Sequence, residues 1–250
     1  MIRTFGVTHC GRVRKQNEDS LLIEPVQGLL VVCDGMGGHV GGEIAAGIAT
    51  RTVAEFISNR KKDDWPFGRQ EDLAEGADLL RNAIFLANQR ITERGEAEPW
   101  LTRMGTTLVS ALIAPDGSLH IANVGDSRAY LRHDRRFRQI TSDHSWVNEQ
   151  VQMGMMSETE AEHHPLRNVI TRALGAQAFG GVDLVEEKLK TGDTLLLCTD
   201  GLTTMLADEI IAELVAKAGA EPEAICRDLV EAANQAGGED NITVAVAVAD

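Results

Sequence analysis

The sequence is poor in cysteine and lacks the patterns by which cysteine holds a metal or cross-links a fold. Its 250 residues include four cysteines: Cys10, Cys33, Cys198 and Cys226. None of them forms a C-x-x-C pair or stands at zinc-ligand spacing from a histidine. Cys33 and Cys198 lie inside apolar runs and are expected to be small buried hydrophobes. This usage of cysteine is typical of a protein from a reducing cytoplasm.

The sequence also lacks the segments and the charge expected of membrane or nucleic-acid-binding proteins. No charged segment followed by an apolar one opens the chain, and no apolar run approaches the roughly 20 residues that span a bilayer. Acidic residues outnumber basic residues by 38 to 24, for a formal net charge of -14. Such a surface repels phosphate backbones and anionic lipids, so we expect neither nucleic acid nor membrane as a partner.

The glycine-rich stretch at 35 to 42, GMGGHVGG, does not match a nucleotide-binding loop. A P-loop ends in G-K-[ST], and this stretch contains no lysine. A dinucleotide fingerprint that began at Gly35 would need a glycine where Val40 stands. We interpret the glycines as allowing tight packing around Asp34 and exposing backbone groups at the start of a helix, where an anion can bind.

Short apolar runs and amphipathic stretches follow one another in an order that favours an α+β fold. The runs with strand character lie at 20 to 24, 28 to 33, 106 to 113, 119 to 124, 193 to 198 and 242 to 249. Helical patterns cover about 42 to 58 and 71 to 98, and two more follow Thr203 and Pro222. Turn signals between 106 and 140 indicate consecutive strands, which pair antiparallel. The polar connector at 59 to 70 and the irregular stretch at 154 to 168 do not resemble domain boundaries, so we expect one domain.

Several acidic residues stand where an apolar strand meets a flexible turn. The segments LLVVCDGMG, LLLCTDGL, GGEDNITVAV and NVGDSR carry Asp34, Asp200, Asp240 and Asp126. A simple turn explains any one of these positions. Taken together, they favour a cation site built from carboxylate and carbonyl oxygens. An all-oxygen set of ligands selects Mg2+ or Mn2+ over zinc.

Eight short motifs follow one another along nearly the whole chain. They are G-x-V-R-x-x-N-E-D (11 to 19), D-G-M-G-G-H (34 to 39), G-T-T (105 to 107), N-V-G-D-S-R (123 to 128), T-x-D-H-S (141 to 145), T-R-A-L-G (171 to 175), C-T-D-G-L (198 to 202) and D-N-I-T-V (240 to 244). In this order they resemble the metal-dependent Ser/Thr protein phosphatases, the type 2C or PPM family. Each motif alone is weak, whereas the ordered set is specific, and the D-G-M-G-G-H form is common in bacterial members.

The resemblance implies a fold and an organisation of the chain. The expected fold is an αββα sandwich of two antiparallel β-sheets flanked by helix pairs, which belongs to the α+β class. Residues 1–250 are expected to form a single phosphatase catalytic domain, with a flap segment at about 145–168 beside the active site. His163 and His164 lie in this flap and are interpreted as surface histidines.

The resemblance also implies a binuclear centre of Mn2+ or Mg2+. Asp34 is expected to bridge the two ions, and Gly35 to offer its carbonyl oxygen. Asp200 and Asp240 are expected to complete the shell of one ion. A water that bridges both ions, acidified toward hydroxide, is expected to attack the phosphorus atom in line, without a covalent phosphoenzyme.

Four further residues receive roles by the same resemblance. Glu18 and Asp19 match an acidic pair, of which one binds a metal directly or through water and the other supports the ligands. Asp126 matches a ligand of a third, weakly bound ion, shared with Asp200. Arg14 matches an arginine that grips the substrate phosphate, a role suited to its bidentate fork.

The proton donor to the leaving alkoxide is left open by the sequence. Many eukaryotic family members carry a histidine directly after Asp-Gly, whereas this chain has Met36 there and a histidine at His39. His39 is a candidate general acid, a metal-bound water is an equal candidate, and a structural role for His39 in the loop competes with both. His144 is interpreted as structural, and Ser127 and Cys33 as a turn residue and a core residue rather than nucleophiles.

These expectations combine into a Mn2+- or Mg2+-dependent phosphatase acting on phosphoserine and phosphothreonine in proteins. Two alternatives stay open: a metal-dependent phosphatase of a small phosphomonoester, and a non-catalytic relative that binds phosphoproteins. The presence of Arg14, Asp34, Asp200 and Asp240 speaks against the non-catalytic alternative. A cytoplasmic monomer that opposes a Ser/Thr protein kinase is the simplest expectation.

Overall fold

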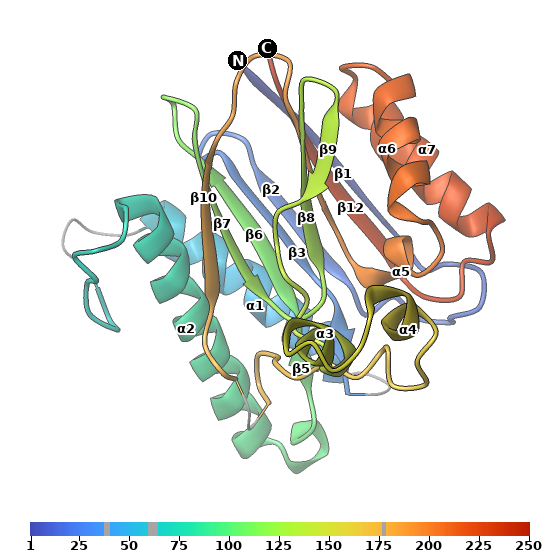
Figure 1. Cartoon of the computed structure of the whole chain (residues 1–250). Coiled ribbons are helices and arrows are strands. Elements are labelled where there is room, and N and C mark those ends of the chain that lie inside the picture. The colour runs from blue at the N-terminus through green and yellow to red at the C-terminus, as the bar shows by residue number, and fades with distance from the viewer. Residues whose placement is uncertain (38–40, 60–64, 177–178) are drawn as a thin grey trace.

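Two five-stranded antiparallel sheets lie face to face in the computed structural model, which describes residues 1–37, 41–59, 65–176 and 179–250 (Figure 1). The first sheet has the strand order β1-β12-β11-β8-β9. Its strands are β1 (Ile2–His9), β12 (Ile242–Ala249), β11 (Thr194–Cys198), β8 (Arg128–His133) and β9 (Arg136–Gln139). The pairing of β1 with β12 runs from Ile2 opposite Ala249 to His9 opposite Ile242, so the two ends of the chain lie side by side.

The second sheet has the strand order β10-β7-β6-β3-β2. Its strands are β10 (Asp183–Lys188), β7 (Ser118–Val124), β6 (Leu108–Ile113), β3 (Leu29–Cys33) and β2 (Ser20–Glu24). Below it, β4 (Gly35–Met36) and β5 (Gly105–Thr106) form a separate two-stranded sheet, in which Gly35 pairs with Thr106. Consecutive strands pair antiparallel in both large sheets, as the turn signals predict.

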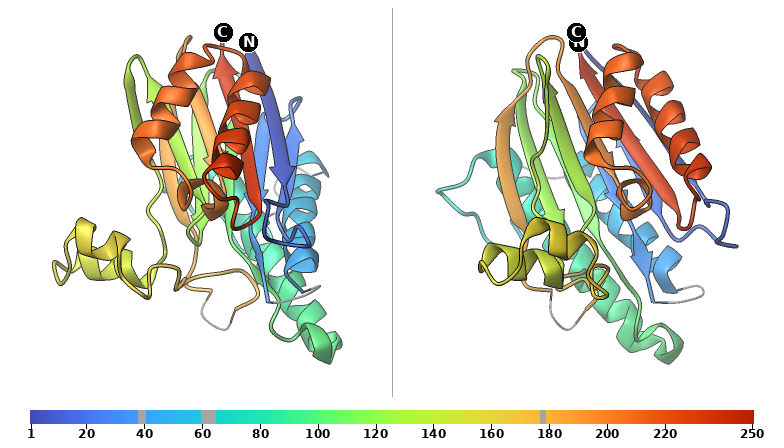
Figure 2. Two further views of the ribbon diagram at one scale, coloured as in Figure 1. Left: turned by 90° about the vertical axis from the view of Figure 1, so that its right-hand side faces the viewer. Right: turned by 45° about the vertical axis from the view of Figure 1, so that its right-hand side comes forward.

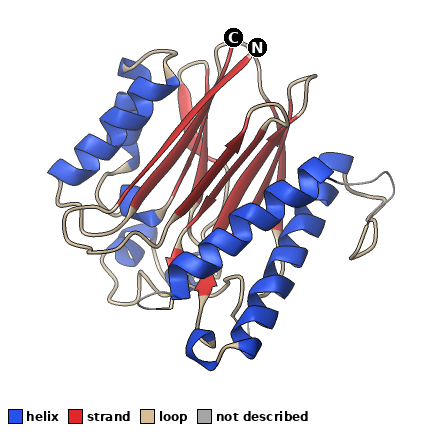
Figure 3. Cartoon of the chain, turned by 180° about the vertical axis from the view of Figure 1, so that it is seen from behind, coloured by secondary structure: helices blue, strands red, loops and turns tan. Residues whose placement is uncertain are grey.

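Helix pairs cover the outer face of each sheet (Figures 2 and 3). The pair α1 (Gly41–Asn59) and α2 (Glu75–Ala97) packs on the second sheet, and the pair α6 (Asp208–Lys217) and α7 (Pro222–Gln235) packs on the first. The remaining helical segments are short: η1 (Pro99–Leu101), α3 (Trp146–Gln152), α4 (Glu158–Glu162) and α5 (Asp200–Thr203). The expected αββα sandwich is therefore confirmed.

Alternation of side chains along the central strands builds three apolar layers. On β3, Leu30 and Val32 face the layer between the sheets, whereas Leu29, Val31 and Cys33 face the layer under α1 and α2. On β12, the alanines lie between the sheets and the valines lie under α6 and α7. Full burial of one aliphatic side chain of this size stabilises the fold by about 1.5–3 kcal/mol. A shift of one residue in strand pairing would turn these apolar side chains to the opposite face of the sheet, so their alternation fixes the register of β3 and β12.

The strands predicted at 20 to 24 and 242 to 249 are present with those bounds. Strands β1 and β10 lie outside the predicted strands, because both are only partly buried and carry polar side chains. Strands β8 and β9 lie outside the apolar runs as well, but within the stretch at 106 to 140 that the turn signals predict as consecutive strands. The stretch at 154 to 168, expected to be irregular, contains α4, which begins with a capping box between Ser157 and Glu160. None of the described helices is both long and apolar enough to cross a bilayer.

Candidate functional site

Acidic residues from separate parts of the chain meet at the end of the sandwich that lies away from the termini (Figure 1). Asp34 follows β3, Asp200 begins α5 directly after β11, and Asp240 lies just before β12. Asp126 lies in the turn between β7 and β8. The connection from β1 to β2 brings three further residues to this end: Arg14, Glu18 and Asp19. Because antiparallel strands of two sheets end together here, residues far apart in the sequence become neighbours.

Asp34 is fixed through its backbone by two threonines of the G-T-T segment. Its N–H donates to Thr107 Oγ1 at 3.0 Å, and its carbonyl oxygen accepts from Thr106 Oγ1 at 2.8 Å. Burial, then the charges of Asp19 and Asp200, raise the pKa of the Asp34 carboxyl well above its usual range. Interaction with Asp200 also raises the pKa of Asp34 and acts in the opposite direction on Asp200, as expected when two buried carboxyls share one proton.

Asp19 is tied to the ends of two strands of the first sheet. Its Oδ2 accepts from Thr199 Oγ1 at 3.0 Å and from Thr243 Oγ1 at 2.6 Å, and its side chain is almost fully buried. Burial raises the pKa of Asp19 to about 7, although the two threonine bonds act in the opposite direction. Asp200 and Asp240 raise it further by like-charge repulsion. Asp19 therefore locks the β1–β2 connection to the strands that carry Asp200 and Asp240.

Asp126 and Asp200 carry the remaining buried carboxyls of the cluster. Burial, then the charges of Asp200 and Asp143, raise the pKa of Asp126 to about 8. Burial is also the largest cause of the raised pKa of Asp200, and Arg14 and Arg128 partly offset it by attraction. When these acids are ionised, the nearby arginines Arg14 and Arg128 therefore neutralise only part of their negative charge.

Three buried oxygens of this cluster have no hydrogen-bond partner within the described parts of the chain: Asp19 Oδ1, Asp126 Oδ1 and Asp200 Oδ1. A buried, unpartnered polar atom is costly, so such oxygens call for a proton or a cation. Among the described residues, no three acids, histidines or cysteines already surround one point. Like charges keep carboxylates apart until a cation neutralises them. These carboxylate oxygens fit Mg2+ or Mn2+ better than zinc, which prefers thiolate and imidazole ligands.

Arg14 lies at the rim of the cluster, over Asp240. Its Nη2 donates to Asp240 Oδ2 at 2.7 Å, and the Arg14 side chain is 57% exposed. Attraction to Asp240 raises the pKa of Arg14, and Glu18 and Asp200 contribute to the same field. The guanidinium is therefore held beside the acids through Nη2, while more than half of the side chain stays exposed.

Gly35 and Gly42 leave room for Glu18 beside the start of α1. A Cβ on Gly42 would clash with Glu18 Oε2, and a Cβ on Gly35 would clash with the Glu18 carbonyl oxygen and with the Gly42 carbonyl oxygen. The Glu18 N–H donates to Asn241 Oδ1 at 2.8 Å, which ties Glu18 to the residue after Asp240. The interpretation that these glycines allow tight packing next to Asp34 is thus consistent with the geometry.

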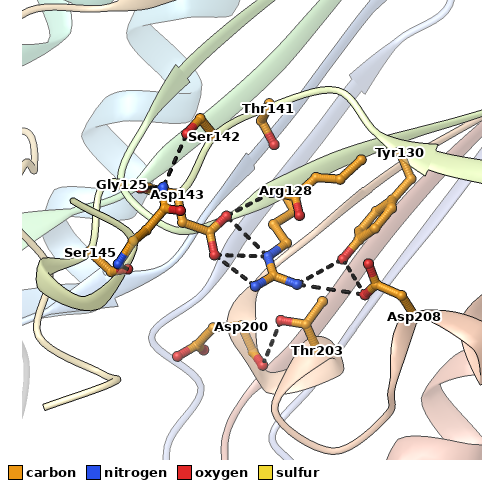
Figure 4. Close-up of polar contacts among 12 residues, drawn as sticks. Gly125, Arg128, Tyr130, Thr141, Ser142, Asp143, Ser145, Asp200, Thr203 and Asp208 are labelled. Carbon is orange, nitrogen blue, oxygen red and sulfur yellow. Dashed lines mark hydrogen bonds and ion pairs between the residues drawn. The ribbon is translucent and has the colours of Figure 1, made fainter. Parts of the chain in front are cut away.

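Arg128 is a charged residue of this region for which the sequence predicts no role (Figure 4). It lies at the start of β8, and its guanidinium lies between the carboxylates of Asp143 and Asp208, near Asp200. Its position as the last residue of the N-V-G-D-S-R segment is a sequence signal, but its partners are far along the chain. Thr199 and Thr243, which bond to Asp19, are not predicted from the sequence for the same reason.

Other residues singled out by the sequence lie in structural positions. His144 is buried and its Nδ1 accepts the Gly125 N–H at 3.0 Å, so it orders the turn before Asp126. Ser127 is buried and its hydroxyl bonds to Thr107 Oγ1 at 2.7 Å, and Cys33 lies in the core. His39 lies outside the described residues.

Comparison with known proteins gives matches along nearly the whole chain. The model of the protein phosphatase 2C family matches residues 8–222. The serine/threonine phosphatase stp of Listeria monocytogenes is 38% identical over 240 residues, which are 95% of this chain and 92% of the relative.

Solved structures agree with the sequence matches. The crystal structure of the Mycobacterium tuberculosis serine/threonine phosphatase PstP superposes with a TM-score of 0.86 at 36% identity and covers 100% of this chain and 99% of that one. The catalytic domain of PstP in complex with two manganese ions superposes with a TM-score of 0.84 at 33% identity, with the same coverage of both chains.

Proposed function

Because this chain belongs to the protein phosphatase 2C family and is a manganese-dependent protein serine/threonine phosphatase, we propose that the carboxylate cluster at the end of the sandwich is its reaction centre. One observation carries this proposal: buried carboxyl oxygens of Asp19, Asp126 and Asp200, from separate segments, meet there without hydrogen-bond partners among the described residues. Buried acids that lie close together are stabilised by protons or by bound cations, and carboxylate oxygens are the ligands that Mg2+ prefers in such sites.

The proposed metal ligands are the side chains of Asp34, Asp200 and Asp240 and the Gly35 carbonyl oxygen. Asp34 is the proposed bridge between two ions. Glu18 and Asp19 are proposed to complete or support this set, and Asp126 to hold a third ion together with Asp200. Cations bound there would neutralise the phosphate oxygens and lower the pKa of the attacking water.

Other residues are proposed to bind the phosphate, to position the acids and to protonate the leaving group. Arg14 is proposed to bind the phosphate of the substrate, because Asp240 anchors one side of its guanidinium and the exposed side presents further donors. The threonines around Asp19 and Asp34 hold both acids before the substrate arrives, which avoids reorganisation during the reaction. The proton donor to the leaving alkoxide is proposed to be either His39 or a metal-bound water.

Attack by water on phosphorus, without a phosphoenzyme, is the reaction that these residues support. Ser127 is buried and hydrogen-bonded to Thr107, and burial raises the pKa of the Cys33 thiol well above its usual range. Neither side chain is therefore available as a nucleophile. Acids whose pKa is raised by burial, and further by neighbouring charges, instead supply a site in which a cation and a water can replace protons.

The wider biology is proposed from the family and from the chemistry of the chain. Its substrates are proteins phosphorylated on serine or threonine, and we propose that it opposes a Ser/Thr protein kinase as a bacterial, cytoplasmic monomer in signal transduction. The four cysteines are free thiols, as expected in a reducing compartment. We further propose that residues 1–250 form one catalytic domain and that the segment at about 145–168, with α3 and α4, is its flap.

A direct assay tests this function. Hydrolysis of p-nitrophenyl phosphate and of phosphothreonine and phosphotyrosine peptides is measured with Mn2+, Mg2+ or a chelator. We expect turnover of the phosphothreonine peptide with Mn2+ and none with chelator. Asp34→Ala and Asp240→Ala are expected to lose nearly all activity, while their circular dichroism stays that of the wild type.

Each failure of this assay has a distinct meaning. Turnover of p-nitrophenyl phosphate without turnover of phosphopeptides would favour a small-molecule phosphatase. No Mn2+-dependent turnover of any substrate would contradict the enzyme assignment and favour a non-catalytic relative. Full activity of Asp34→Ala would show that the bridging role belongs to another residue.

A further inference from the structure

Arg128 makes a side-on ion pair with Asp143 (Figure 4). Arg128 Nη2 lies 2.7 Å from Asp143 Oδ2, and Arg128 Nε lies 3.0 Å from each oxygen of the same carboxylate. Both side chains are mostly buried, with 27% of Arg128 and 15% of Asp143 exposed. A planar guanidinium that meets a carboxylate edge-on fixes the orientation of both groups, which a lysine ammonium does not do.

The other side of the guanidinium contacts the segment that follows Asp200. Arg128 Nη1 donates to the Tyr130 hydroxyl at 3.0 Å, and that hydroxyl donates to Asp208 Oδ1 at 2.9 Å. Arg128 Nη1 itself lies 3.6 Å from Asp208 Oδ1. Asp208 begins α6, only a few residues after Asp200 at the start of α5. One guanidinium thus links β8 to the chain segment that carries Asp200.

Asp143 belongs to the segment that leads into α3, which we call the flap base, residues 141–148. The Asp143 carbonyl oxygen accepts from Asn148 Nδ2 at 2.6 Å, so Asp143 is joined to the first turns of α3. The next residue, His144, donates its N–H to the Gly125 carbonyl oxygen at 3.0 Å and accepts the Gly125 N–H at its Nδ1. The flap base is therefore bonded to the residue directly before Asp126.

We propose that Arg128 is a positioning residue that clamps the flap base to the turn of Asp126 and to the segment of Asp200, so that the flap and the carboxylate cluster are held as one unit. This inference rests on the proposed assignment of the cluster as the cation site. Its consequence is reciprocal: cation binding orders the flap base, and an intact flap base strengthens cation binding by the same factor.

Two variants separate this role from that of an ordinary ion pair. Asp143→Asn keeps the shape of the side chain and removes its charge, and Arg128→Lys keeps the charge and removes the fork. The matched control is Arg138→Ala, which breaks the pair between Arg138 of β9 and Glu187 of β10. That pair also joins the two sheets at their edge, and its printed partner atoms lie on β9 and β10 rather than on the flap base or the cluster.

The experiment measures Mn2+ binding by calorimetry and amide hydrogen exchange across residues 143–152, with and without Mn2+. In the wild type and in Arg138→Ala, Mn2+ is expected to slow exchange in this segment. In Asp143→Asn and in Arg128→Lys, we expect faster exchange, loss of the Mn2+ effect, and Mn2+ affinity lowered about tenfold. The double variant is expected to lose less than the sum of the two single variants, because both break the Arg128–Asp143 pair.

The possible failures are distinguishable. Wild-type Mn2+ affinity and a wild-type response of exchange in both Asp143→Asn and Arg128→Lys would overturn the clamp while leaving the proposed function intact. Failure of the wild type itself to bind Mn2+ would overturn the proposed function and the clamp together. If Asp143→Asn does not fold, as judged by circular dichroism, Arg128→Lys alone decides, because it retains the charge opposite Asp143.

Discussion

Burial raises the pKa of Asp126 to about 8 and of Asp19 to about 7, far above the usual value of an aspartate. Two threonine hydroxyls bond to Asp19, and attraction to Arg128 offsets only part of the effect of burial on Asp126. An acid whose ionised form is destabilised by burial is stabilised most by a bound cation. The acids of the cluster therefore favour binding of added metal cations over ion pairs with side chains of the protein.

Arg14 offers a prediction at the scale of one side chain. We expect Arg14→Ala to raise KM for a phosphothreonine peptide about tenfold or more with a smaller effect on kcat, because a charge-assisted bond to phosphate contributes about 1.5–3 kcal/mol. Arg14→Lys is expected to restore part of the loss, since it keeps the charge without the fork. Steady-state kinetics in saturating Mn2+ checks this. A fall in kcat at unchanged KM would contradict the phosphate-binding role.

The sequence predicts the residues of the cluster better than it predicts their supports. Asp34, Asp200 and Asp240 stand at ends of apolar strands, and this local pattern is visible in the sequence. Thr199 and Thr243 hold Asp19 from about 180 and 224 positions away, and Arg128 meets Asp143 across a turn of strands. Partners of this kind are set by sheet topology, so no local pattern reveals them.

Among the secondary-structure elements, the apolar strands were predictable from the sequence, and the polar edge strands β1 and β10 were not. Strand β12 is buried along its whole length and reads as a continuous apolar run. Strand β10 lies at the edge of its sheet and carries the sequence DLVEEK, whose acidic side chains partly face water. Charged side chains on an edge strand disfavour pairing with other chains. The charges that make β10 hard to predict as a strand therefore also reduce aggregation at this edge of the sheet.

Helix α1 offers a prediction at the scale of an element. Alanine in place of glycine inside a helix ordinarily stabilises it by about 1 kcal/mol. We expect Gly42→Ala instead to displace Glu18, because the added Cβ clashes with the Glu18 carboxylate and lies within 2.8 Å of Gly35 backbone atoms. Mn2+ affinity, measured by calorimetry, should fall about tenfold or more.

Gly95→Ala in α2 is the matched control for Gly42→Ala. Its added Cβ would meet the Leu101 carbonyl oxygen at 3.4 Å, an ordinary contact, so Mn2+ affinity should not change. Equal Mn2+ affinities for Gly42→Ala and the wild type would mean that Glu18 does not need the space beside α1.

For the whole molecule, the acids of the cluster are part of a formal net charge of -14, and several of them are buried. In the folded protein the raised pKa values keep protons on Asp19 and Asp126 at a pH where the unfolded chain has released them. The folded state then binds more protons than the unfolded state, and the free energy of unfolding falls as pH rises. The affected window runs from the ordinary aspartate value of 3.8 up to about 7 to 8.

Thermal unfolding in a chelating buffer should therefore show higher stability near pH 5.5 than near pH 8. Addition of Mn2+ at pH 8 should restore the loss, because a cation that binds only the folded state stabilises it by mass action. Asp126→Asn should flatten the pH dependence and raise the free energy of unfolding at pH 8 by about 1–2 kcal/mol in chelator. A melting temperature that rises from pH 5.5 to pH 8 in chelator would contradict this prediction.

The central claim, that the strand-end carboxylates form the cation site of the phosphatase, is tested most directly by locating manganese in crystals. Anomalous diffraction recorded at the manganese absorption edge from Mn2+-soaked wild-type crystals should give two peaks joined by the Asp34 carboxylate. Asp200 and Asp240 should lie within coordination distance of one of them, and Asp34→Ala crystals should lose the pair. Peaks confined to other parts of the molecule, in a preparation that hydrolyses a phosphothreonine peptide with Mn2+, would contradict the account.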